Sequence, residues 1–273
     1  MSHIIIYINI VMELTPCLGL GDLLILKSIA IANDLNITKI HLSIPLMKNY
    51  RQYPERFAQF ITQFIKMLFP KILVDIVPDT HNRVIYEKYV FKSPYIYDYL
   101  RLPTVEIPYK NYITFHTKVR MDYSSTEFMQ NELPILEKRF RKFKTGKTII
   151  IMGERVVENC YEQRVLGITS IYSSLLFLKK HNHVTDLTKE ILYSGNPDYG
   201  DFVYDLNVIR RAGLNVTFGI GGPFGLCHAF SQHNLSYLGV THNYDYLFSK
   251  YQGVHRDLKN FVTELSTYFE KKN

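Results

Sequence analysis

Residues 214–230 read LNVTFGIGGPFGLCHAF, and this stretch predicts the kind of fold around it. Val216–Phe218 consists of β-branched and aromatic residues typical of a strand, and Pro223 suits the first turn of a helix. Between them, Gly219–Gly222 has the composition of a tight turn. The stretch is therefore predicted to be a strand–turn–helix unit of an α/β protein.

The same order of elements begins near the N-terminus. Ile4–Val11 is rich in Ile and apolar except for Asn9, as in a strand covered on both faces, and Gly19–Asp22 separates it from a helical pattern. Further strands are expected at Lys39–Ile44 and Ile72–Val77, with a helix after Pro54 between them. Strands that alternate with helices in this way predict a parallel sheet with helices packed on it.

The pattern restarts after a Pro- and Tyr-rich stretch at residues 103–112. We therefore expect two doubly wound, Rossmann-like domains, residues 1–108 and 109–273, that face each other across a cleft. The last helix is also considered as an element that packs back on the first domain. Ligands of such folds bind at the carboxyl ends of the strands. In the second half, strands are expected at Tyr112–His116, Thr148–Met152, Val216–Phe218 and Leu235–Val240, and helices near residues 126–143, 203–212 and 258–269.

The composition is that of a globular protein, with 273 residues, 47% of them hydrophobic, and a formal net charge of +7. This charge favours anionic ligands. No block of five or six like charges occurs, which argues against a basic tail for nucleic acid. The three cysteines are far apart and indicate reduced thiols in a cytoplasm. The N-terminal apolar run is too short to span a bilayer, so we expect no transmembrane segment, while peripheral contact with a membrane stays open.

Asp22 follows Gly19 and Gly21 where a strand is expected to give way to a helix. Asp is a favoured N-cap residue, because its carboxylate accepts hydrogen bonds from the first N–H groups of a helix. At the carboxyl edge of a sheet it can also act as a general base that takes a proton from an acceptor hydroxyl. Both roles stay open, and the two glycines would let a ligand approach the backbone.

A phosphate-binding site is predicted at the second glycine turn. Gly221, Gly222 and Gly225 stand where a helix begins, and the N–H groups of a helix start attract anions. Lys118 and Arg120 follow the strand at Tyr112–His116 and would hold a diphosphate from the other side. Two ordinary surface cations are an equally good explanation of that pair.

Two further residues complete the candidate site. Glu154 follows the strand Thr148–Met152 and would bind hydroxyl groups of a nucleoside or sugar, although a salt-bridged turn explains it too. His228 follows the glycine turn and would donate to a phosphate or sugar oxygen, although a helical histidine is more often structural. The sequence has no Asp-x-Asp triplet, so we expect neither a metal ion nor another cofactor.

Taken in order, these residues resemble the heptosyltransferase-like glycosyltransferases of the GT-B fold. The resemblance is carried by Gly-Leu-Gly-Asp at residues 19–22, by Lys118 and Arg120, by Gly153-Glu154, and by the glycine turn with Gly225 and His228. It implies that Asp22 is the catalytic base and that the basic segment contacts the donor phosphate. Pro223 and Phe224 replace an acidic and a hydroxyl residue of the family, so heptose is not assumed as the sugar.

The expected activity is therefore an inverting, metal-independent transfer of a sugar from a nucleoside diphosphate to a hydroxyl of a glycan or lipid-linked saccharide. Arg51, Arg56 and Arg83 are candidates for contact with an acidic acceptor. A nucleotide-sugar epimerase or hydrolase shares this architecture and stays open as an alternative. So does a non-catalytic protein that binds nucleotide sugars or nucleic acid, although nucleic acid is not the expected partner.

Overall fold

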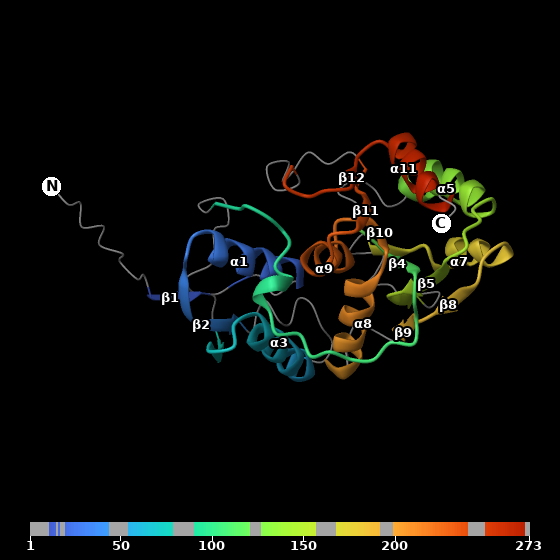
Figure 1. Cartoon of the computed structure of the whole chain (residues 1–273). Coiled ribbons are helices and arrows are strands. Elements are labelled where there is room, and N and C mark those ends of the chain that lie inside the picture. The colour runs from blue at the N-terminus through green and yellow to red at the C-terminus, as the bar shows by residue number, and fades with distance from the viewer. Residues whose placement is uncertain are drawn as a thin grey trace.

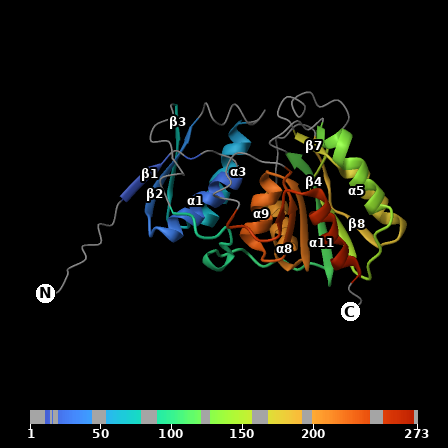
Figure 2. The same ribbon diagram turned by 90° about the horizontal axis from the view of Figure 1, so that it is seen from above.

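The computed structural model describes residues 11–14, 16, 20–43, 54–78, 90–120, 127–156, 168–191, 199–239 and 249–270. These residues form two larger, mainly parallel sheets and one pair of short strands, with helices packed between and around the larger sheets (Figure 1, Figure 2). The α/β class with parallel sheets, which the alternation of strands and helices predicts, is confirmed.

The first sheet comes from the N-terminal part of the chain and has three parallel strands in the order β1-β2-β3. They are β1 (Val11–Leu14), β2 (Asn36–Ser43) and β3 (Leu73–Val77), and the connections between them contain α1 (Leu20–Ala32) and α3 (Pro54–Leu68). Both helices share one apolar cluster with β2. The three- and four-residue spacing of apolar side chains in α3 explains this, because it places them on one helix face.

The second sheet has the strand order β12-β11-β10-β4-β5-β8, with all of these strands parallel, and a short strand, β7, that pairs antiparallel with the end of β4. Every residue of β10 is buried, as expected for a central strand covered on both faces. The strands are β4 (Tyr112–Arg120), β5 (Thr148–Met152), β7 (Ile168–Ser170), β8 (Val184–Asp186), β10 (Leu214–Gly219), β11 (Asn234–Tyr237) and β12 (Val254–His255), and β6 (Glu154–Val156) pairs separately with β9 (Lys189–Ile191).

Helices cover both faces of the second sheet. Those on one face, α8 and α9, belong to the same apolar cluster as α1 and α3, whereas α5, α7 and α11 share a second cluster on the other face. The helices are α5 (Leu133–Phe140), α7 (Tyr172–Leu175), α8 (Tyr199–Arg211), α9 (Gly222–Phe230) and α11 (Leu258–Glu270), with short 3-10 or π segments η2 (Tyr97–Tyr99), η3 (Phe128–Glu132) and η4 (Leu176–Lys180).

The two halves of the molecule meet through these helices. The ring of Phe202 in α8 contacts Phe60 and Phe64 of α3 edge-on, with centroids 5.1 and 5.5 Å apart. In Figure 1, α1 and α3 accordingly lie between the first sheet and the pair α8 and α9. The apolar core is therefore continuous from the first sheet to the second.

Some elements differ from their predicted bounds. The expected first strand, Ile4–Val11, shares only Val11 with β1, and residues 4–10 lie outside the described residues. The expected helix near residues 126–143 is divided into the π turn η3 and the shorter α5. The last helix, α11, does not pack back on the first sheet, because its apolar face belongs to the cluster of α5 and the second sheet. Its Phe269 stacks on Phe143 with ring centroids 4.4 Å apart.

Candidate functional site

The carboxyl ends of β4 and β10 bring two of the predicted segments together. Arg120 pairs with Gly219 in the ladder between these strands, so the basic segment ends beside the start of the glycine turn. The register shifts between Val216 and Phe218, because β4 contains two more residues than β10 in this interval. Lys118 is partly buried, and Arg120 is placed by its backbone alone.

The glycine turn leads directly into α9. Gly221 is the N-cap residue with extended backbone, and Pro223 lies in the first turn. A glycine cap has no side chain that can accept hydrogen bonds from the first N–H groups of the helix. A Cβ atom added to Gly222 would meet no atom of the described residues within 4 Å, apart from its chain neighbours and the backbone of its own helix. The start of α9 is therefore bordered by open space, and its N–H groups favour an anion.

The first turn of α1 lies against the first turn of α9. A Cβ atom on Gly225 would come within 3.1 Å of the Cα atom of Gly21 and within 3.5 Å of Leu24 Cδ1. Gly225 therefore has a packing role, since it permits the two helices to approach closely. Its predicted contact with a phosphate stays a prediction. The contact between Gly21 and Gly225 places the starts of both helices at one edge of the molecule.

Asp22 is the third residue of α1 and lies in its first turn. This position is inside the helix, so the N-cap interpretation is replaced by that of a first-turn carboxylate, which the positive end of the helix dipole stabilises. The side chain is partly buried. The contact between α1 and α9 brings Asp22, the residue after Gly21, to the same edge as the glycine turn.

The end of β5 reaches the same edge one strand further along. Gly153 has a positive φ of 102°, and a Cβ atom there would lie 2.9 Å from Thr117 Oγ1. Glu154 follows as the first residue of β6, and its backbone pairs with Lys189 of β9. The structure places Glu154 by its backbone alone. Gly19, Arg51 and Arg83 lie outside the described residues, and Arg56 is placed only by its backbone in α3.

His228 lies apart from the glycine turn. It is six residues after Gly222 in α9, which is about 9 Å along a helix axis. Its Nε2 lies 3.0 Å from Ser236 Oγ, and its Nδ1 lies 3.5 Å from the amide nitrogen of Asn234. Burial lowers the pKa of His228 to about 3, so the ring is uncharged near neutral pH. His228 is therefore an uncharged residue of the contacts beneath α9, and its predicted contact with a phosphate or sugar oxygen stays a prediction.

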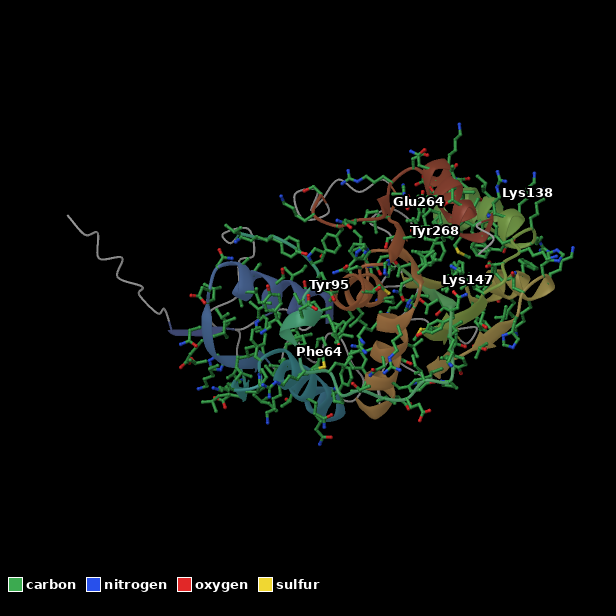
Figure 3. All side chains as sticks on the ribbon, viewed as in Figure 1. Phe64, Tyr95, Lys138, Lys147, Glu264 and Tyr268 are labelled. Carbon is green, nitrogen blue, oxygen red and sulfur yellow. The ribbon has the colours of Figure 1, made fainter. Side chains whose placement is uncertain are left out.

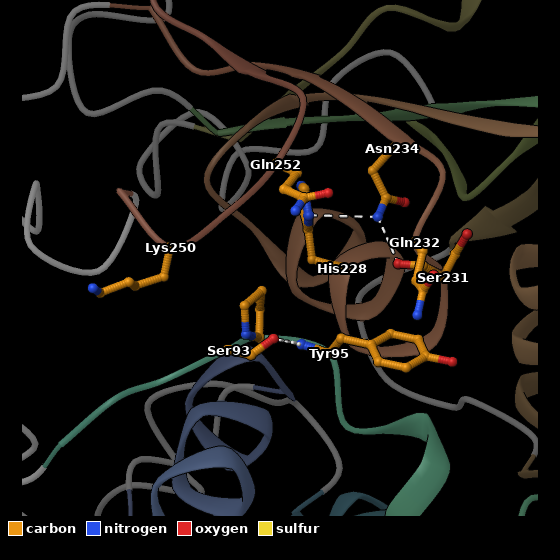
Figure 4. Close-up of a pocket in the computed structure, with 9 residues that line it drawn as sticks. Ser93, Tyr95, His228, Ser231, Gln232, Asn234, Lys250 and Gln252 are labelled. Carbon is orange, nitrogen blue, oxygen red and sulfur yellow. Dashed lines mark hydrogen bonds between the residues drawn. The ribbon is translucent and has the colours of Figure 1, made fainter. Parts of the chain in front are cut away.

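A small cavity of about 280 Å³ borders His228 at the opposite edge of the sheet, where β11 and β12 begin (Figure 4). Most of the residues around it carry polar side chains, and its volume is at the lower limit of ligand pockets. It is lined by Ser93, Pro94, Tyr95, His228, Ser231, Gln232, Asn234, Lys250 and Gln252.

A buried polar network beneath α9 is the main feature that the sequence analysis missed. The Thr114 hydroxyl donates to Asn215 Oδ1 over 2.7 Å and lies 3.4 Å from His116 Nε2, which is 3.2 Å from Cys227 Sγ. Burial lowers the pKa of His116 to about 4 and raises that of the Cys227 thiol, so both groups are uncharged near neutral pH. Cys227 is therefore no activated nucleophile.

The network crosses three neighbouring strands, and a pattern in the sequence could have predicted it. Thr114 and His116 on β4, Asn215 and Thr217 on β10, and Asn234 and Ser236 on β11 are buried polar residues two positions apart in otherwise apolar strands. Side chains two residues apart share one face of a sheet. The pattern therefore predicts a polar layer on that face, and the contacts between Asn215, Asn234, His228 and Ser236 complete it.

No protein-family model, no curated protein and no solved structure matches this chain. Among the residues that the structure describes, no helix is long and apolar enough to cross a membrane. The same residues contain no group of three His, Cys, Asp or Glu side chains placed to hold a metal ion.

Proposed function

We propose that the chain is a glycosyltransferase that binds a nucleoside diphosphate sugar at the carboxyl edge of the second sheet. The observation that carries this proposal is the contact between Gly21 and Gly225. It brings the first turns of α1 and α9 together beside the end of β4, so that two helix starts, Asp22 and the end of the basic segment lie at one edge.

In this proposal the two sheets belong to two Rossmann-like domains of a GT-B arrangement. The second domain holds the donor, with the diphosphate at Gly221 and Gly222 and near Lys118 and Arg120, and with the nucleoside near Glu154. The first domain holds the acceptor, a glycan or a lipid-linked saccharide, on the side of Asp22. The division near residue 108 is part of the same proposal.

The proposed reaction is an inverting displacement. The acceptor hydroxyl oxygen attacks the anomeric carbon of the donor sugar while the bond from that carbon to the diphosphate oxygen breaks. Asp22 takes the hydroxyl proton, and the electron pair of the broken bond stays with the diphosphate. Helix N–H groups and nearby cations stabilise the charge that develops there, which is where fixed donors contribute most to catalysis. The mechanism as proposed uses no metal ion.

Acceptor dependence of product release tests this function. With a panel of nucleoside diphosphate sugars and candidate acceptors, we expect free nucleoside diphosphate to appear only when donor and acceptor are both present. Release from the donor alone would instead indicate a hydrolase or epimerase. Binding without any turnover across the panel would indicate a non-catalytic nucleotide-sugar protein.

Substitution Gly222→Ala tests the anion site at the start of α9. Its methyl group meets no atom of the described residues within 4 Å beyond its chain neighbours and its own helix, so we expect an unchanged or slightly higher melting temperature. The same methyl group would occupy the space of the diphosphate, and nucleotide affinity should fall about tenfold or more, the equivalent of one charge-assisted hydrogen bond. Isothermal titration with nucleoside diphosphates measures this. Gly146→Ala is the matched control, because Gly146 also has open space around its Cβ position. Equal affinity in the two variants would remove the turn from the site.

The double substitution Lys118→Ala and Arg120→Ala tests the basic segment. We expect nucleoside diphosphate binding to weaken by about 1–3 kcal/mol, the range for lost charge-assisted bonds. The corresponding nucleoside without phosphates should bind as it does to the unmodified protein. The control removes two exposed cations at the other edge of the sheet, Lys142 and Lys144. An equal loss of nucleoside diphosphate affinity in the control would mean that binding depends on the net charge of the protein and not on Lys118 and Arg120.

A further inference from the structure

Two basic segments lie side by side where β5 and β8 begin. Residues 138–147 and 179–183 contain eight Lys and Arg residues and no Asp or Glu. The net charge of the whole chain is +7, so the remaining residues together carry a net charge of −1. The positive charge of the protein is therefore concentrated in this one region.

The structure holds the two segments against each other. The side-chain amide of Asn182 donates to the Phe143 carbonyl over 2.8 Å, and its oxygen accepts a hydrogen bond of 2.7 Å from the Thr145 N–H. The Ile149 N–H, one residue into β5, donates to the His183 carbonyl over 2.9 Å. These bonds make one continuous exposed surface, the basic surface, from Lys138, Arg139, Arg141, Lys142, Lys144, Lys179 and Lys180.

In the described part of the chain, the one acidic residue of α5 does not neutralise this surface. Glu137, the carboxylate next to it in α5, is partly buried and accepts a 2.7 Å hydrogen bond from the Ser174 hydroxyl. Ile135 lies one helical turn before Lys138 and Arg139 on the same face of α5 and is 49% exposed. An exposed aliphatic residue beside clustered cations is a pattern of helices that rest on anionic membranes.

The aromatic side chains of the region are already covered. The guanidinium of Arg141 lies over the ring of Phe177, 3.2 Å from its centroid, and Phe143 is buried and stacked on Phe269. Single-stranded nucleic acid is held by open aromatic rings on which bases stack. These rings are therefore not free for bases, which favours a lipid surface as the partner.

We propose that the basic surface binds the headgroups of an anionic lipid bilayer. The surface lies at the amino ends of β5 and β8. In Figure 3, Lys138 lies on the side of the second sheet away from Phe64 of α3. The glycine turn lies at the carboxyl ends, so a protein bound in this way keeps its candidate site turned away from the lipid. This inference does not depend on the proposed transferase activity.

Sedimentation of the full chain with phosphatidylcholine vesicles, with and without phosphatidylglycerol, tests the proposal. We expect binding only to vesicles that contain phosphatidylglycerol, with an affinity that falls steeply as salt is added. The test variant carries Lys142→Gln, Lys144→Gln, Lys179→Gln and Lys180→Gln. Its affinity should be lower by on the order of a hundredfold or more, from about fivefold per cation near the membrane.

The control variant loses the same charge elsewhere, through Lys71→Gln, Lys92→Gln, Arg101→Gln and Arg211→Gln, all at exposed positions. We expect it to bind these vesicles within a few fold of the unmodified protein, with an equal melting temperature in both variants. Equal losses in the two variants would overturn the proposal, because net charge alone would then explain the binding. It would also be overturned by equal binding to vesicles without phosphatidylglycerol, or by tight binding to oligonucleotides but not to vesicles.

Discussion

The variant Asp22→Asn is expected to fold normally and to lose roughly 10²- to 10⁴-fold in turnover at saturating donor, the usual contribution of a general base. Asn keeps the shape of the side chain but cannot take the proton of the acceptor hydroxyl near neutral pH. Since Asp22 lies in the first turn of α1, removal of its charge should cost about 0.3–1 kcal/mol of stability through the helix dipole. Donor affinity should change little, because the proposed base faces the acceptor.

Asp201→Asn is a matched control for this prediction. The helix α8 begins Tyr199-Gly200-Asp201, so Asp201 occupies the same third position, again after a glycine, as Asp22 does in α1. Its carboxylate lies 2.9 Å from Lys189 Nζ. We expect this variant to show a similar small loss of stability and near-normal turnover. Near-normal turnover in Asp22→Asn as well would exclude Asp22 as the base.

Acid is expected to destabilise the protein through its two buried histidines. Their folded pKa values, about 4 for His116 and about 3 for His228, lie below the value of about 6.5 in an unfolded chain. Between about pH 6.5 and pH 4 the unfolded state therefore binds more protons, and each histidine lowers the free energy of unfolding by about 1.4 kcal/mol per pH unit. The stability that the uncharged histidines contribute is complete above the unfolded pKa of about 6.5 and is lost as the pH falls toward their folded pKa values.

Asp205 opposes this trend. Burial raises its pKa to about 6, so below that pH the folded state binds the extra proton and gains stability. The unmodified protein should then lose a net of about 1.4 kcal/mol per pH unit below pH 6, and Asp205→Asn about twice as much. Denaturant unfolding of both proteins between neutral pH and pH 4 measures the two slopes. A free energy of unfolding that is independent of pH in both would contradict the burial of uncharged His116 and His228.

The sequence predicts the elements that rest on local patterns. Apolar runs at Thr148–Met152 and Val216–Phe218 gave strands within one or two residues of β5 and β10, and Gly219–Gly222 led to α9 as expected. Three-residue strands such as β7 and β8 escaped prediction, because so few residues show no clear alternation.

Long-range packing decided the rest of the candidate site. The role of Gly225 depends on Gly21, about two hundred positions away in the chain, and no local pattern contains such a contact. The place of His228 depends on Asn234 and Ser236 of the next strand, whereas its sequence neighbours suggested a ligand of the glycine turn. The basic surface joins two segments that are separate in sequence. Residues 138–147 alone contain six Lys and Arg residues, but Phe, Thr and Gly interrupt them, and only the structure places residues 179–183 beside them.

Hydrogen exchange with and without nucleoside diphosphate sugars tests the central claim most directly, because it locates the bound donor. We expect slower amide exchange at residues 219–225, which contain the start of α9, and at residues 117–120 of β4. Exchange at residues 231–234 and 250–253, around the small cavity, should be unchanged. Protection confined to the cavity, or no protection in any of these segments at saturating nucleotide sugar, would contradict a donor site at the carboxyl edge of the second sheet.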